Sequence, residues 1–134
     1  MIDIWFETNQ EYEKTKQSLE EICKKSFIED TTTELEFIDV MYTFETTPSG
    51  LDLFEFMKET AEAAGPAPID QVRLGGSSDA AGITMAGVPT ICACGTQGEG
   101  HHTIHEYALV NSLPERAKLF SAALVRIDEF SPKQ

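Results

Sequence analysis

The chain has 134 residues, of which 41% are hydrophobic and 25% charged, as in a soluble globular protein of at most one ordinary domain. Its 23 acidic and 10 basic residues give a formal charge of −13, which excludes nucleic acids and anionic membrane surfaces as ordinary partners. No segment approaches the ~20 apolar residues of a membrane span, and the N-terminal sequence lacks a basic leader. We therefore expect a cytoplasmic protein with three reduced cysteines, Cys23, Cys92 and Cys94.

The first third of the chain predicts a strand, a helix and a second strand. Residues 2–7 alternate apolar and polar side chains with the period of two that a half-buried strand requires. Thr8 and Glu11 have the spacing of a capping box, from which a helix should run to about Ser26. Residues 33–44 are rich in β-forming side chains, with one change of phase, and predict a long strand with a bulge.

Residues 46–50 interrupt this periodic pattern and mark the best candidate for a boundary. Pro48 suits the first turn of a helix, which Gly65 and Pro66 should end. The remaining expected segments are a short run at 72–74, a brief helix from Ser78 to Met85, a buried strand at 90–94, a glycine-rich loop at 95–105, and a last helix begun by a capping box at Ser112 and Glu115. This alternation predicts an α/β fold.

All three histidines lie close together, as His101, His102 and His105 in the glycine-rich loop. Neutral imidazole is the commonest metal ligand, but no third ligand stands at a recognised spacing, so a polar surface loop explains the cluster better than a metal site. Cys92 and Cys94 are two residues apart on the expected strand and could join these ligands. Burial as small hydrophobic side chains explains the two cysteines better, because they lack the turn that a C-x-x-C motif supplies.

The sequence GGSSDAAG joins a glycine turn to the start of a helix, where free N–H groups can receive an anion. Arg73 lies just before this turn and could bind a substrate carboxylate with both arms of its guanidinium group. An ordinary surface ion pair with Asp70 or Asp79 is the alternative for this arginine.

Three motifs in this order resemble a known family: R-L-GGSSDA at 73–80, GVPT at 87–90, and the segment 95–120 that contains GEGHHTIHEY. They resemble the carboxyl-terminal end of the two-zinc exopeptidases and deacylases, which include carboxypeptidase G, peptidase T, acetylornithine deacetylase and succinyl-diaminopimelate desuccinylase. The segment IDIWFETNQEYEKTKQSLEEI is similar to part of that family's lid, or dimerisation, domain, with Trp5 where the family usually has arginine.

The resemblance implies roles for individual residues. His102, four residues before the pair Glu106 and Tyr107, takes the position of a ligand to one of two zinc ions. Arg73 takes the position of an arginine that holds the substrate's carboxylate. The pocket beside it would be bordered by Gly76, Ser77 and Ser78, and Asp79 would cap the following helix.

The resemblance also shows what the sequence lacks. The family's His-x-Asp pair and its Glu-Glu pair are absent, so no catalytic residue is assigned here. We expect the carboxyl-terminal piece of a zinc-dependent enzyme that hydrolyses a peptide or N-acyl amide bond in a small carboxylate-bearing substrate, inactive by itself. The alternative is an acidic binding or scaffolding module that has lost the chemistry.

The implied architecture has two pieces. Residues 1–47 would form half of a ferredoxin-like lid domain, and residues 48–134 the carboxyl-terminal part of the catalytic domain. In a ferredoxin-like sheet the strand order is 4-1-3-2, so the strands at 2–7 and 33–44 would lack the strand between them. Because unpaired strand edges recruit other strands, we expect the chain to form a homo-oligomer through its first 47 residues.

Overall fold

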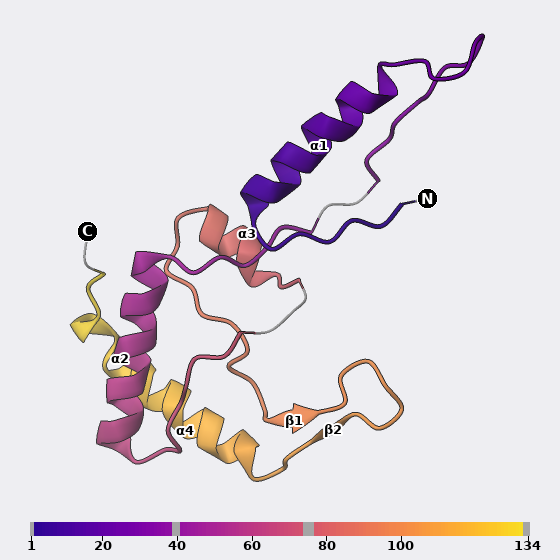
Figure 1. Ribbon diagram of the computed structural model, residues 1–134. Helices are drawn as coiled ribbons and strands as arrows, with labels where there is room; N and C mark the ends of the chain where they lie inside the picture. The colour runs from indigo at the N-terminus through magenta and orange to yellow at the C-terminus, as the bar shows by residue number, and fades with distance from the viewer. Residues whose placement is uncertain (1, 39–40, 74–76, 133–134) are drawn as a thin grey trace.

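A computed structural model of the protein describes residues 2–38, 41–73 and 77–132. The described chain is rich in helix and contains a two-stranded antiparallel sheet, a mixture compatible with the α/β class. Figure 1 shows α1 and its flanking segments projecting away from the part that contains α2, α4 and the sheet. In order, the elements are α1 (Asn9–Cys23), α2 (Pro48–Ala64), α3 (Ala80–Met85), β1 (Gly98–Glu99), β2 (Tyr107–Ala108), α4 (Ser112–Val125) and the 3₁₀ turn η1 (Ile127–Glu129).

Helix α1 begins with the capping box that its sequence predicts. The Thr8 hydroxyl accepts a hydrogen bond from the Glu11 backbone N–H at 3.2 Å, and the Glu11 carboxylate accepts one from the Thr8 N–H at 3.2 Å. Two of the first unpaired N–H groups of the helix are thereby satisfied. The helix ends at Cys23, before the expected Ser26.

The strands predicted at 2–7 and 33–44 are not formed in the described residues. Both segments are irregular, and only residues 3–7 alternate exposed and partly buried side chains. A strand needs a hydrogen-bonded neighbour, and the contact that holds the second segment beside α1 comes from a side chain instead. The Asn9 amide donates to the Thr43 carbonyl at 3.1 Å and accepts from the Thr43 N–H at 2.9 Å.

Helices α2 and α4 pack against each other and form the core. Helix α2 has Pro48 in its first turn and ends at Gly65, with φ +79°, as its sequence predicts, and Thr47 is its N-cap. The buried hydrophobic residues of this core are Phe56, Met57, Ala61, Leu119 and Ala123.

A hydrogen-bonded link across this core ties α2 to the end of α4. Thr60 is completely buried, and its hydroxyl donates to the Phe56 carbonyl at 2.8 Å and accepts from the Arg126 guanidinium at 3.1 Å. The guanidinium carbon of Arg126 also lies 5.7 Å from the centre of the Phe56 ring. The buried hydroxyl is therefore satisfied, and the pair of helices is fixed in one register.

Two further predictions from the sequence are wrong. Residues 90–94 are not a strand, because Ala93 adopts φ +57° and interrupts the extended backbone. Helix α4 does not begin with a capping box, since Asn111 is the N-cap and makes no side-chain cap. The Ser112 hydroxyl instead donates to the Leu109 carbonyl at 2.6 Å. None of the helices in the described part of the chain has the length and apolar character that a membrane span requires.

Candidate metal and carboxylate site

His102, the candidate metal ligand, lies on a β-hairpin that is hydrogen-bonded to the start of α4. Strands β1 and β2 pair antiparallel, with Gly98 opposite Ala108 and Glu99 opposite Tyr107. Below them, the Gln97 carbonyl accepts from the Leu109 N–H at 2.7 Å, and the Gln97 N–H donates to the Ser112 hydroxyl at 2.9 Å. The serine that was expected to cap α4 therefore attaches the hairpin to that helix.

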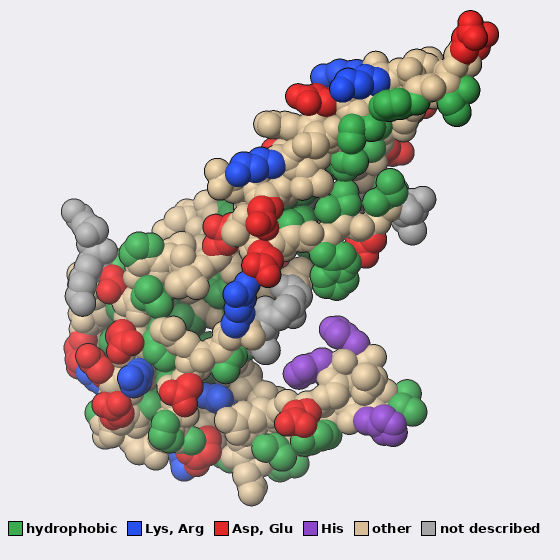
Figure 2. Space-filling model, viewed as in Figure 1, with side chains coloured by type: hydrophobic (Ala, Val, Ile, Leu, Met, Phe, Trp, Pro, Cys, Tyr) green, Lys and Arg blue, Asp and Glu red, His purple; other side chains and the backbone are tan. Residues whose placement is uncertain are grey.

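The loop of the hairpin has its own hydrogen bonds, which hold the turn that contains His102. The Gly100 carbonyl accepts from both the hydroxyl and the backbone N–H of Thr103, at 2.7 and 3.0 Å, while Gly100 and His102 adopt positive φ values of 77° and 62°. The loop that was expected at 95–105 is thus largely a short, ordered hairpin. Figure 2 shows the histidines gathered on it, two of them facing the hollow below the N-terminal part.

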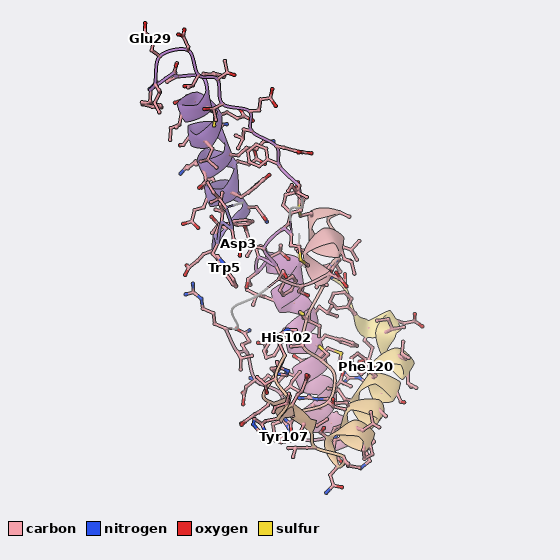
Figure 3. The ribbon with its side chains drawn as sticks, turned by 90° about the vertical axis from the view of Figure 1, so that its right-hand side faces the viewer. Asp3, Trp5, Glu29, His102, Tyr107 and Phe120 are labelled. Atoms are coloured by element: carbon pink, nitrogen blue, oxygen red, sulfur yellow. The ribbon has the colours of Figure 1, made fainter. Side chains whose placement is uncertain are left out.

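The histidines of the hairpin are exposed to solvent. His101 Nδ1 lies 3.6 Å from the Glu106 carboxylate, whereas His102 makes no hydrogen bond or ion pair with the described residues. Figure 3 shows His102 at the middle height of the molecule, between Trp5 above and Tyr107 below. An exposed imidazole with a free lone pair is able to bind a metal ion.

Arg73 is positioned by a linker that is anchored to α4. The Ala67 N–H donates to the Glu115 carboxylate at 3.2 Å. The pKa of Glu115 is lowered by its hydrogen bond from Lys118 and by the one from Ala67, so the anchor carboxylate is charged. At the end of the linker, the Arg73 guanidinium donates to the Glu7 carboxylate at 2.6 Å, with side chains 82% and 75% exposed. Arg73 therefore forms a surface ion pair, as in the alternative considered from the sequence, but its partner is Glu7 and not Asp70 or Asp79.

The residues that follow Arg73 are only partly described. Gly76, expected beside the carboxylate, lies outside the described residues. The Ser77 hydroxyl donates to Met41 Sδ at 3.3 Å, and the Ser78 hydroxyl accepts from the Ala80 N–H at 3.2 Å. The Ser78 hydroxyl thus satisfies an N–H group at the start of α3. Asp79 stands at the N-cap position of this helix, as expected, but its side chain makes no capping hydrogen bond.

The two neighbouring cysteines are less buried than expected. Cys92 is exposed, and its sulfur lies 2.9 Å from the Ser78 hydroxyl. Cys94 is half-buried, and burial raises the pKa of its thiol. A raised thiol pKa disfavours the thiolate form of Cys94 in the metal-free chain.

The described residues do not form a complete metal site. No three or more His, Cys, Asp and Glu side chains among them are placed to hold an ion together. A catalytic zinc takes about three protein ligands, and the hairpin offers His102 and its neighbours alone. The fold thus exposes one candidate ligand and does not surround it with others from the described chain.

Similarity to known proteins identifies the family. The model of peptidase family M20/M25/M40 matches residues 4–126. The chain belongs to this family. No curated protein and no solved structure has significant similarity to it.

Membership of M20/M25/M40 confirms the resemblance seen in the motifs. It indicates a hydrolase of the metallopeptidase or amidohydrolase type, in a family that is generally metal-dependent and acts on peptides. The match includes both the hairpin with His102 and the segment with Arg73. Sequence reasoning missed Glu7, because no local pattern indicates an ion pair between residues 66 positions apart.

Proposed function

We propose that the chain contributes one metal ligand and a carboxylate-binding group to the site of an M20-type zinc hydrolase. His102 would bind one of two zinc ions, and Arg73 with Gly76, Ser77 and Ser78 would bind the carboxylate of a peptide or N-acyl amino acid. The observation that carries the proposal is the family match over residues 4–126, which spans both groups. The remaining metal ligands and the general base would come from outside this chain, whose sequence lacks the family's His-x-Asp and Glu-Glu pairs, so the chain alone should hydrolyse nothing.

The first test is the affinity of the chain for zinc. One exposed imidazole leaves most coordination positions to water, so the dissociation constant should be about micromolar or weaker. Calorimetric titration of the full chain with zinc should show this weak binding, and His102→Ala should reduce it. His105→Ala is the matched control, because it removes an exposed imidazole from the same loop without removing the proposed ligand.

A tighter complex would overturn this arrangement. Nanomolar affinity that disappears in His102→Ala would mean that other residues complete the site, and Cys92 and Cys94 would then be tested as ligands. If His102→Ala and His105→Ala weaken zinc binding equally, His102 is not the specific ligand that we propose.

The second test concerns the carboxylate. Acetylglycine is a small N-acyl amino acid, and its binding can be followed by the NMR shift of the Ser78 amide. Arg73→Lys should weaken this binding about five- to tenfold, because a point ammonium cannot make the two parallel hydrogen bonds of a guanidinium. Arg116→Lys is the control, with the same chemical change in α4.

Two comparisons make this test specific. The carboxamide of acetylglycine should bind equally to the wild-type chain and to Arg73→Lys, since it carries no negative charge. Glu7→Gln should strengthen acetylglycine binding about two- to fivefold, because it removes the anion that occupies the guanidinium in an exposed ion pair. If Arg73→Lys weakens the binding of acetylglycine and of its carboxamide equally, Arg73 does not bind the carboxylate and only forms a surface ion pair with Glu7.

A further inference from the structure

Two of the three cysteines lie two residues apart, in the segment that leads into the hairpin. Cys92 is exposed, whereas Cys94 is half-buried. The Cys94 thiol donates a hydrogen bond to the Cys92 carbonyl at 3.5 Å, so its sulfur lies beside residue 92. The two thiols are therefore neighbours in space as well as in sequence, and they can react as a pair.

The backbone between these cysteines is not that of an extended strand. Ala93 adopts φ +57°, in the left-handed region that residues with a side chain seldom enter. In an extended strand, Cα atoms two residues apart are separated by ~6.6 Å, near the upper limit of about 6.8 Å for a disulfide. With Ala93 left-handed, the Cys94 side chain instead turns back toward residue 92, as a disulfide between the two cysteines requires.

A hydrogen bond holds the exposed sulfur of Cys92 in one position. The Ser78 hydroxyl oxygen lies 2.9 Å from this sulfur and also accepts from the Ala80 N–H at 3.2 Å. Because the oxygen already accepts one hydrogen bond, the hydroxyl hydrogen is available for the sulfur. Cys92 is thus both accessible to a reagent in solution and ordered, which suits the thiol that reacts first.

The surroundings of Cys94 suit a second step. Burial is the largest cause that raises the pKa of its thiol, and it disfavours direct reaction with a reagent in solution. The Arg116 guanidinium acts in the opposite direction and lowers this pKa, so a positive charge lies near an attacking thiolate. The charge of Cys92 raises the pKa as well, and this effect disappears once the Cys92 sulfur is bonded to another sulfur.

We propose that Cys92 and Cys94 are a modification site, a dithiol that small disulfides such as oxidised glutathione convert into an internal disulfide. In the first step the Cys92 thiol loses its proton to solvent. Its thiolate attacks one sulfur of the reagent, displaces one glutathione thiolate and forms a mixed disulfide with the other half. This inference does not depend on the proposed hydrolytic function.

The second step closes the ring. The Cys94 thiol loses its proton to solvent, and its thiolate attacks the Cys92 sulfur of the mixed disulfide. The bond from Cys92 to glutathione breaks as the bond from Cys92 to Cys94 forms. The two displaced thiolates take up the two protons, so the protein is oxidised by two electrons and one oxidised glutathione is reduced to two thiols.

The test is the reaction of the full chain with oxidised glutathione, with EDTA present so that no metal ion protects the thiols. Trypsin cleaves after lysine and arginine, so Cys23 falls in the peptide 17–24 and the cysteine pair in the peptide 74–116. Mass spectrometry should show the second peptide lighter by two hydrogens and without bound glutathione. Dithiothreitol should restore its original mass, because it reduces disulfides.

Single serine variants separate the roles of the cysteines. Cys94→Ser should stop the reaction at the mixed disulfide, so the peptide 74–116 should gain one bound glutathione. Cys92→Ser should react at least about tenfold more slowly, because it removes the exposed thiol. Cys23→Ser is the matched control, since it removes the remaining cysteine and should form the internal disulfide at the wild-type rate.

Three results would overturn the proposal. If the wild-type chain keeps glutathione bound to the peptide 74–116, the Cys94 thiol does not reach the Cys92 sulfur. If Cys92→Ser reacts as fast as the wild-type chain, Cys92 is not the attacking thiol. If dimers linked by a disulfide form in place of the internal bond, these thiols react with a second chain and not with each other.

Discussion

Replacing Phe56 with alanine should lower the free energy of unfolding by about 3–5 kcal/mol, the cost of removing a buried aromatic ring. Phe56 is 7% exposed and belongs to the buried cluster that joins α2 to α4. Its ring lies 5.5 Å from the Phe130 ring and 5.7 Å from the Arg126 guanidinium carbon, so its loss removes packing on two sides. This cluster is small for the length of the chain, so the variant should lose most of its cooperative unfolding transition.

Urea denaturation followed by helical circular dichroism measures this loss. Phe27→Ala is the matched control, because the same substitution at a side chain that is 75% exposed should change the free energy by less than about 0.5 kcal/mol. If the Phe56 and Phe27 variants unfold at the same urea concentration, the α2 and α4 pair is not the element that stabilises the chain.

The helices could be predicted from the sequence because their signals are local. The capping box of Thr8 and Glu11, the proline at position 48 and the glycine at position 65 each act within one turn of helix. These signals depend on no distant residue. The helical part of the fold therefore follows from short stretches of sequence.

The strands could not be predicted in the same way, because a strand depends on its neighbours. Residues 2–7 and 33–44 have strand-like patterns, yet no ladder partner lies beside them in the described chain. Strands β1 and β2 have two residues each and show no alternation that a sequence pattern could reveal. The Ser112 hydroxyl, which the sequence assigned to a capping box, accepts a hydrogen bond from Gln97 beside this pair of strands.

In the candidate site, too, local motifs reveal individual residues but not their distant partners. The histidine cluster and Arg73 were found from local motifs, and the structure places His102 on an ordered turn. The partner of Arg73 was not found, because Glu7 lies in a distant segment. The division of the chain at residues 47 and 48 stays a prediction from the family resemblance.

The turn that carries His102 should be lost in Gly98→Ala. A methyl group at Gly98 would lie 2.0 Å from the Tyr107 carbonyl oxygen and 3.1 Å from the Ala108 Cα. Real Cβ atoms do not approach backbone atoms so closely, and the paired strand cannot move away without breaking the hairpin. Overpacking of this kind costs about 1–3 kcal/mol, comparable to all that a two-residue pair of strands contributes, so the hairpin should open.

NMR detects this change as loss of the contact between residue 98 and Ala108, together with faster exchange of the Leu109 amide. Gly95→Ala is the matched control, because its added methyl group has no atom within 4 Å and should leave the hairpin intact. The helices should keep their circular dichroism in both variants, since the clash is confined to β1 and β2. A hairpin that persists in Gly98→Ala would mean that the bonds from Gln97 to Leu109 and Ser112 hold it without strand pairing, and His102 would then keep its position.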